Sequence, residues 1–104
     1  MKTLKLTLKK QWFDMILFGQ KTEEYREIKG YWVTRLIDNY FTNNQKFKDF
    51  DFVEFTNGYN KNSPTVTLDF LGICEGKGKP EWGAIENETY FIIKLGSEVS
   101  RKNC

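Results

Sequence analysis

The chain has 104 residues, with 16 Lys and Arg against 14 Asp and Glu, and no histidine. This length predicts one domain with one hydrophobic core, built largely from the aromatic residues that make up 16% of the chain. The net charge of +2 is too small to indicate a strongly basic nucleic-acid-binding surface. The lack of histidine excludes a histidine-based acid–base pair, metal site or pH switch, so a general base must be Lys, Glu, Asp, Tyr or a thiolate.

The two cysteines, Cys74 and Cys104, do not predict a disulfide framework, because one lies in an apolar stretch and the other is the last residue. The first residues run directly into an alternating pattern, and no apolar run approaches membrane-spanning length. We therefore expect a soluble, cytoplasmic protein with no membrane partner. No ligand-spaced set of metal-binding residues occurs, so neither a metal nor another cofactor is expected.

The first part of the chain predicts strand, helix, strand and helix in turn. Leucines alternate with polar residues over 4–8, which is typical of a half-buried strand. An apolar stripe predicts a helix over 10–18, and Gly19 is suited to end it in the left-handed conformation. A second strand is expected over 22–28, and apolar residues at helical spacing predict a second helix over 31–40.

Strands dominate the pattern that follows. Residues 43–45 are expected to form a loop, and 47–57 a third strand. The Asn-Gly pair at 57–58 is a turn signal. A fourth strand is expected over 64–74, with a bulge or bend at Gly72.

Residues 75–83 form one long irregular segment that combines three glycines with two lysines, two glutamates and a tryptophan. One interpretation is a flexible hairpin loop. The alternative is a rim over a cleft, where Lys77 or Lys79 contacts a phosphate and Trp82 stacks on a base.

The last strand is expected over 90–95, central in the sheet because it is apolar on both faces, and ended by Gly96. The domain is thus expected to span 1–97, and residues 98–104 to form a polar C-terminal tail. About five strands, two early helices and long connections predict an α+β fold. A small bent sheet that closes into a β-barrel, with helices packed near its openings, fits this pattern.

A charged stretch joins the first helix to the second strand. Because strand side chains alternate, Glu24 and Arg26 are predicted to share one face and Glu23 and Tyr25 the other, while Lys21 lies at the turn. If buried, these charges need mutual pairing. If exposed in a cleft, they suit a polar ligand that offers both donors and acceptors. A solvated salt-bridge strand is the alternative.

Four of these residues match a family signature. Gly19, Lys21, Glu24 and Arg26 fit G-x-K-x-x-E-x-R, by which the chain resembles the ASCH domain family, and the signature follows a first strand and helix as in that family. The resemblance implies a PUA-like barrel and a cleft for RNA or a modified nucleoside. In that cleft Lys21 would face a phosphate or an acyl oxygen, and Arg26 a second anionic or carbonyl group. Glu24 would accept hydrogen bonds from a base edge or orient the two cations.

The resemblance also implies possible chemistry. A branch of the family hydrolyses the amide of N4-acetylcytidine. By this resemblance Lys21 would be the general base. A carboxylate of the later loop, Glu81 or else Glu75, would be its catalytic partner. That branch has a threonine three residues after the lysine, where this chain has Glu24, so Glu24 would have to activate a water instead. Other family members resemble ribonucleases, in which Lys21, Arg26 and a tyrosine such as Tyr25 would stabilise a cyclising phosphate.

A third interpretation involves no chemistry. Small single-domain chains of this type act as regulatory or inhibitory modules that occupy an RNA or a protein partner. Exposed aromatic residues such as Trp82 or Tyr59 would favour such a role, because aromatic side chains dominate binding energetics. Nothing in the sequence indicates a particular protein partner.

Overall fold

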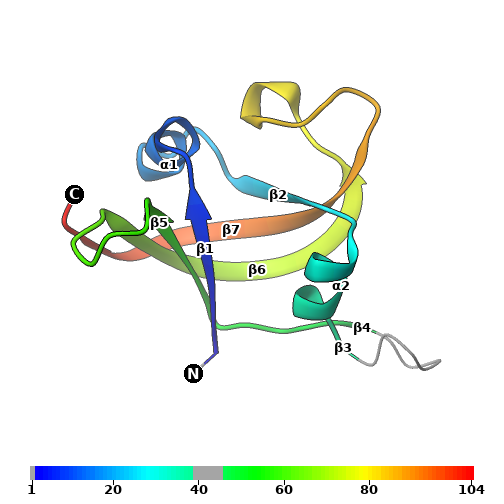
Figure 1. Cartoon of the computed structure of the whole chain (residues 1–104), viewed down its shortest axis with the longest axis horizontal. Coiled ribbons are helices and arrows are strands. Elements are labelled where there is room, and N and C mark those ends of the chain that lie inside the picture. The colour runs from blue at the N-terminus through cyan, green and yellow to red at the C-terminus, as the bar shows by residue number, and fades with distance from the viewer. Residues whose placement is uncertain (1, 39–45) are drawn as a thin grey trace.

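The computed structural model describes residues 2–38 and 46–104, which form an α+β fold as the sequence predicts (Figure 1). The elements in chain order are β1 (Thr3–Leu8), α1 (Lys10–Leu17), β2 (Glu23–Glu27), α2 (Gly30–Leu36), β3 (Ile37–Asp38), β4 (Lys46–Phe47), β5 (Phe52–Asn57), β6 (Thr65–Lys77), the 3₁₀ turn η1 (Pro80–Trp82) and β7 (Thr89–Lys102). None of the helices in these two ranges is long and apolar enough to cross a membrane.

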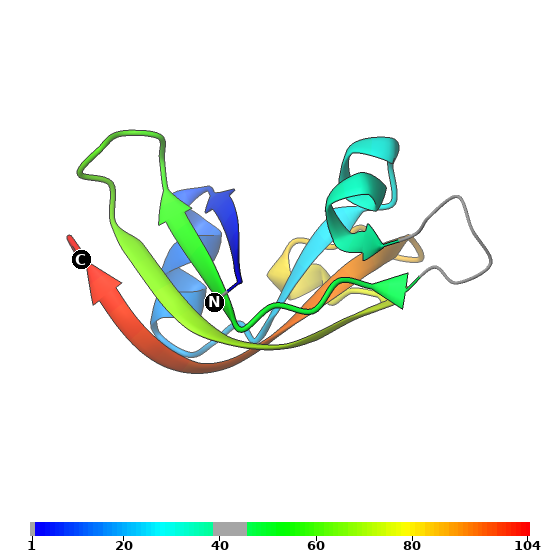
Figure 2. The ribbon, with the colours of Figure 1, turned by 90° about the horizontal axis from the view of Figure 1, so that it is seen from below.

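Five strands form the main sheet, in the order β1-β5-β6-β7-β2. β1 pairs with β5 in parallel, and the other neighbours are antiparallel. The long strands β6 and β7 curve under both helices (Figure 2), and the β6–β7 register shifts near Gly72, whose φ is +120°. This confirms the predicted bulge, because such irregularities bend a sheet. The sheet curls but stays open, since β1 and β2 are its edges and no backbone ladder joins them in the described ranges.

The core fills the inside of the curled sheet. Apolar side chains at alternate strand positions point inward and meet the apolar stripe of α1. Each fully buried aliphatic or aromatic side chain stabilises the fold by about 1.5–3 kcal/mol. The residues with 4% exposure or less include Leu4, Leu6, Phe13, Ile16, Leu36, Val53, Phe55, Val66, Phe91 and Ile93.

The end of α1 sets the direction of the chain into β2. Gly19 has a φ of +76°, and its N–H donates to the carbonyl of Ile16 at 3.1 Å. The N–H groups of Gln20 and Lys21 both donate to the carbonyl of Met15, at 2.8 and 3.1 Å. This is the glycine-ended helix that the sequence predicts, and it fixes the backbone from which the side chain of Lys21 starts.

The second helix is shorter than predicted. It ends at Leu36, and Ile37 takes an extended conformation (φ −120°, ψ 129°) that pairs with Phe47 in the short β3–β4 ladder. A β-branched isoleucine suits this extended backbone. The predicted continuation to residue 40 and the predicted loop at 43–45 lie outside the described residues. The predicted third strand is two strands, β4 and β5.

The last strand is longer than predicted. It does not end at Gly96 but runs to Lys102, because its polar C-terminal half pairs with the first residues of β6. Residues 98–102 of the expected tail therefore belong to the sheet. β2 covers only residues 90–94 of β7, so the remaining edge carries charge, including the ion pair between Glu98 and Arg101 at 2.6 Å. Charged side chains on an open edge disfavour pairing with other chains.

Candidate ligand-binding cleft

A cleft of about 950 Å³ opens between the end of β1 and β2, beside α2 and the segment that follows β6. Its lining is strongly aromatic. The chain has three tryptophans, and all three contribute to this one cleft. The aromatic residues that line it are Trp12, Trp32, Trp82, Tyr25, Tyr59 and Tyr90. Tryptophan and tyrosine combine a flat apolar face with a polar group, a composition typical of sites for planar ligands.

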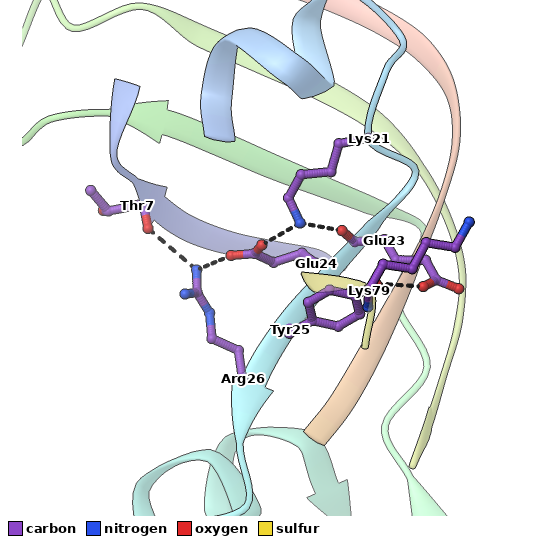
Figure 3. Close-up of polar contacts among 7 residues, drawn as sticks. All are labelled: Thr7, Lys21, Glu23, Glu24, Tyr25, Arg26 and Lys79. Carbon is purple, nitrogen blue, oxygen red and sulfur yellow. Dashed lines mark hydrogen bonds and ion pairs between the residues drawn. The ribbon is translucent and has the colours of Figure 1, made fainter. Parts of the chain in front are cut away.

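Glu24 lies at the centre of a largely buried ion cluster at the floor of the cleft, and Glu24 and Arg26 both contribute to the lining. One carboxylate oxygen, Oε1, is 3.0 Å from Nζ of Lys21, and the other, Oε2, is 3.0 Å from Nη2 of Arg26 (Figure 3). Only 6% of the Glu24 side chain is exposed. The structure thus confirms that Glu24 and Arg26 share a face, and the buried charges are mutually paired, as burial of charge requires.

Lys21 forms the bottom of the cluster. Its side chain is completely buried, and Nζ also donates a hydrogen bond to the backbone carbonyl of Glu23. The same Nζ lies 4.8 Å from the centre of the Tyr25 ring. Burial lowers the pKa of Lys21, while the carboxylate of Glu24 opposes that shift. The ammonium group therefore lies under the cleft and not among the residues that line it.

Arg26 bridges the two open edges of the sheet. From β2, its Nη2 donates to the carbonyl of Thr7 on β1 at 3.3 Å, and its guanidinium lies 5.0 Å from the centre of the Trp32 ring. Arg35 of α2 acts similarly, because its Nη2 donates to the carbonyl of Lys5 at 3.4 Å. On the edge of β1 opposite β5, where no strand of the described residues pairs with it, arginine side chains thus donate to two backbone carbonyls.

Residues 78–88, which connect β6 to β7, form one wall of the cleft, and two tyrosine hydroxyls hold this wall in place. The hydroxyl of Tyr25 donates to Glu23 Oε1 at 2.8 Å and accepts the N–H of Lys79 at 3.0 Å. The hydroxyl of Tyr90 accepts the N–H of Ile85 at 3.0 Å and donates to Glu88 at 3.2 Å. Both ends of the wall, which carries Trp82, are therefore hydrogen-bonded to the sheet.

Close packing explains two glycines of this segment. A Cβ at Gly78 would lie 2.7 Å from Cβ of Ala84 and 2.8 Å from the Tyr25 ring. A Cβ at Gly83, where φ is +104°, would lie 3.0 Å from the Trp12 ring. The wall can approach both aromatic rings because glycine stands at these two positions.

The structure brings together only part of the predicted site. Lys21, Glu24, Tyr25 and Arg26 cluster, and Trp82 lines the cleft, as the rim interpretation requires. The residues that stay outside the cleft lining are Glu75, Lys77, Lys79 and Glu81; each is exposed. β6 extends to Lys77, so the irregular segment begins later than predicted. The Nζ of Lys79 instead lies 4.3 Å from the centre of the Trp82 ring.

Among the aromatic residues that line the cleft, the sequence did not indicate three as site residues. Trp12 and Trp32 belong to the apolar patterns that predict the two helices, and Tyr90 to the predicted central strand. Both tryptophans remain partly exposed in the structure. The available signal was the residue type itself, because tryptophan is seldom fully buried and its N–H needs a partner.

No protein-family model, curated protein or solved structure matches the chain. Within residues 2–38 and 46–104, no group of three or more His, Cys, Asp or Glu side chains is placed to hold a metal ion. The functional interpretation therefore rests on the cleft and on the signature residues beneath it.

Proposed function

We propose that this protein is a PUA-like domain of the ASCH type whose cleft binds a base of RNA or of a modified nucleoside. The observation that carries the proposal is the convergence of all three tryptophans on one cleft above the Glu24–Arg26 pair. The signature at Gly19, Lys21, Glu24 and Arg26 supports the family. A curled five-stranded sheet, spanned at its gap by Arg26, supports a PUA-like barrel.

The aromatic lining supplies the affinity in this proposal. Stacking of a base on an aromatic side chain contributes about 1–3 kcal/mol and tolerates any base, because every base has a flat face. The polar pair supplies selectivity, since an ionised Glu24 only accepts hydrogen bonds and Arg26 only donates them. A base edge offers a donor and an acceptor side by side, which complements these two groups.

Tryptophan fluorescence tests the proposal directly. We expect quenching when nucleosides, N4-acetylcytidine or a single-stranded RNA hexamer are titrated into the protein. Trp82→Ala is expected to weaken binding about 5- to 150-fold, the equivalent of about 1–3 kcal/mol. Phe18→Ala is the matched control, because Phe18 is an aromatic residue with 72% exposure outside the cleft lining.

The Phe18→Ala control distinguishes ligand binding in the cleft from nonspecific ligand binding to exposed aromatic side chains. Equal loss of affinity in Trp82→Ala and Phe18→Ala would contradict the proposal, as would the absence of quenching by every nucleoside and by the hexamer. Both variants are first compared with the wild-type protein by circular dichroism, so that only folded variants are scored.

A second candidate function is hydrolysis of N4-acetylcytidine, favoured by one observation. The carboxylate of Glu24 lines the cleft, where it could act as a general base on a bound water, and the ammonium of Lys21 holds it from below at 3.0 Å. Glu24 would take a proton from water as the water oxygen attacks the acetyl carbonyl carbon. Glu24 would then pass that proton to N4 as the C–N bond breaks, which gives cytidine and acetic acid, and the acid ionises to acetate. Chromatography is expected to show both products with the wild type and neither with Glu24→Gln. No cytidine at stoichiometric enzyme would refute this function.

A further inference from the structure

The buried cluster beneath the cleft is not electrically balanced. Two cations, Lys21 and Arg26, share one carboxylate, that of Glu24. The exposed fractions of the three side chains are 0, 18 and 6% in that order. Charge held away from water is costly unless it is paired, so an excess positive charge here calls for an anion.

Other acidic groups near the cleft compensate the cluster less directly than Glu24 does, although Glu27 and Glu88 also line the cleft. The carboxylate of Glu23 accepts the Tyr25 hydroxyl and forms no ion pair with Lys21 or Arg26, and its charge raises the pKa of Lys21 less than the charge of Glu24 does. Glu27 is 61% exposed and pairs with Lys29 at 2.8 Å, and Glu88 is exposed at the rim. Water and salt screen charges at such exposed positions, whereas the buried cluster is screened much less.

Arg26 also carries an unused donor. Its Nε is the one buried side-chain nitrogen or oxygen in the described residues that has no hydrogen-bond partner. Arg26 lines the cleft. A buried N–H without an acceptor costs about 1–3 kcal/mol, more on a charged group, so such an atom in a native fold points to a missing partner. Guanidinium groups match phosphate oxygens in geometry and in charge.

We propose that the ligand of this cleft carries one phosphate, which docks on Arg26 while the attached base stacks among the tryptophans. This inference rests on the proposed function and narrows it to a nucleotide or to one linkage of an RNA strand. A phosphodiester bears a single negative charge, which balances the single excess positive charge of the cluster. One phosphate also fits a chain whose net charge is only +2.

Calorimetric titration of three probes tests the inference. Cytidine has no phosphate, 3′-cytidine monophosphate has a terminal phosphate, and the dinucleoside monophosphate CpC has one phosphodiester. We expect at least tenfold tighter binding of CpC or of the monophosphate than of cytidine. A preference for CpC assigns the phosphate to an RNA strand, and a preference for the monophosphate assigns it to a free nucleotide. Raising salt from 50 to 200 mM should weaken CpC binding only about threefold, the effect of one phosphate contact.

Variants locate the phosphate. Arg26→Gln is expected to reduce the phosphate preference below threefold while cytidine binding persists. Arg101→Gln, a matched change in an exposed arginine that pairs with Glu98, should keep the full preference. If Arg26→Gln fails to fold, Lys21→Met serves instead. It removes one positive charge from the same cluster and should also reduce the ratio of the affinity for the phosphate-bearing probes to the affinity for cytidine.

The outcomes separate the inference from the function on which it rests. Equal affinity for cytidine, the monophosphate and CpC would overturn the phosphate inference and leave base binding intact. A salt effect of tenfold or more on CpC, or a full phosphate preference in Arg26→Gln, would also overturn it. Binding of none of the probes, nor of the RNA hexamer, would remove the proposed function itself.

Discussion

Replacing Glu24 by glutamine keeps the shape of the side chain and removes its charge, which leaves two cations buried side by side. Lys21 and Arg26 each lie 3.0 Å from the Glu24 carboxylate, so both lose their counter-ion in this variant. Removal of one partner from a buried ion cluster costs about 3–5 kcal/mol, because the remaining charge is uncompensated. A domain of this size is stable by about 5–15 kcal/mol, so Glu24→Gln is expected to fold with a strongly reduced stability.

Replacing Lys21 by methionine should have a much smaller effect. Methionine has a similar volume, and Arg26 still compensates Glu24 in that variant. The variant loses the hydrogen bond to the Glu23 carbonyl, worth about 1 kcal/mol, but it also avoids the cost of burying an ammonium group. We expect the free energy of unfolding to change by about 1 kcal/mol or less.

Urea unfolding at pH 7 measures the two changes, and the double variant gives a third comparison. Lys21→Met should partly restore the stability of Glu24→Gln, because it removes one of the two unpaired cations. Arg101→Gln controls for the loss of an exposed ion pair and is expected to change stability by less than about 1 kcal/mol. An equal loss of stability in Lys21→Met and Glu24→Gln, without restoration in the double variant, would refute the excess positive charge.

Two further predictions concern the wall of the cleft. The pKa of Tyr25 is raised from 10.0 to about 12, mainly by burial, so the folded protein keeps a proton that the unfolded chain loses. The stability that this hydroxyl contributes is complete below pH 10 and is lost as the pH rises to about 12. In urea unfolding over that pH range, the wild type should lose about 2–3 kcal/mol of unfolding free energy relative to Tyr25→Phe. Parallel pH dependence of the two proteins would contradict the raised pKa. Gly78→Ala should lower the free energy of unfolding by about 1–3 kcal/mol, because the added Cβ overpacks against Ala84 and Tyr25. It should also displace Trp82, which would shift the fluorescence maximum. An unchanged midpoint of unfolding would show that the wall adjusts without cost.

The strands and helices whose signal is local were predicted correctly from the sequence. The alternating leucines of β1, the apolar stripe of α1 and the glycine that ends it each depend on a few neighbouring residues. The bulge at Gly72 is of the same kind. The pairing of Glu24 with Arg26 was also predictable, because strand geometry alone puts residues i and i+2 on one face.

Features that depend on distant contacts were not predictable in the same way. The helix expected to reach residue 40 gives way to β3 at Ile37, where pairing with β4 overrides the helical pattern. The polar residues after Gly96 continue β7 because β6 offers them backbone partners, a contact that composition does not reveal. The glycine-rich segment predicts Lys77, Lys79 and Glu81 as site residues, whereas none of the three is among the residues that line the cleft. The ammonium of Lys79 lies over the ring of Trp82 instead.

The central claim is that a base binds among the three tryptophans, and the indole N–H signals in a proton–nitrogen NMR spectrum test it most directly. The chain has three tryptophans and all three line the cleft, so each of the three indole signals comes from a lining residue. During titration with CpC, we predict that all three signals shift, with the backbone amides of β2, while the amides of residues 97–102 at the far end of β7 stay unchanged. Shifts confined to other parts of the chain, with unmoved indole signals, would contradict the claim.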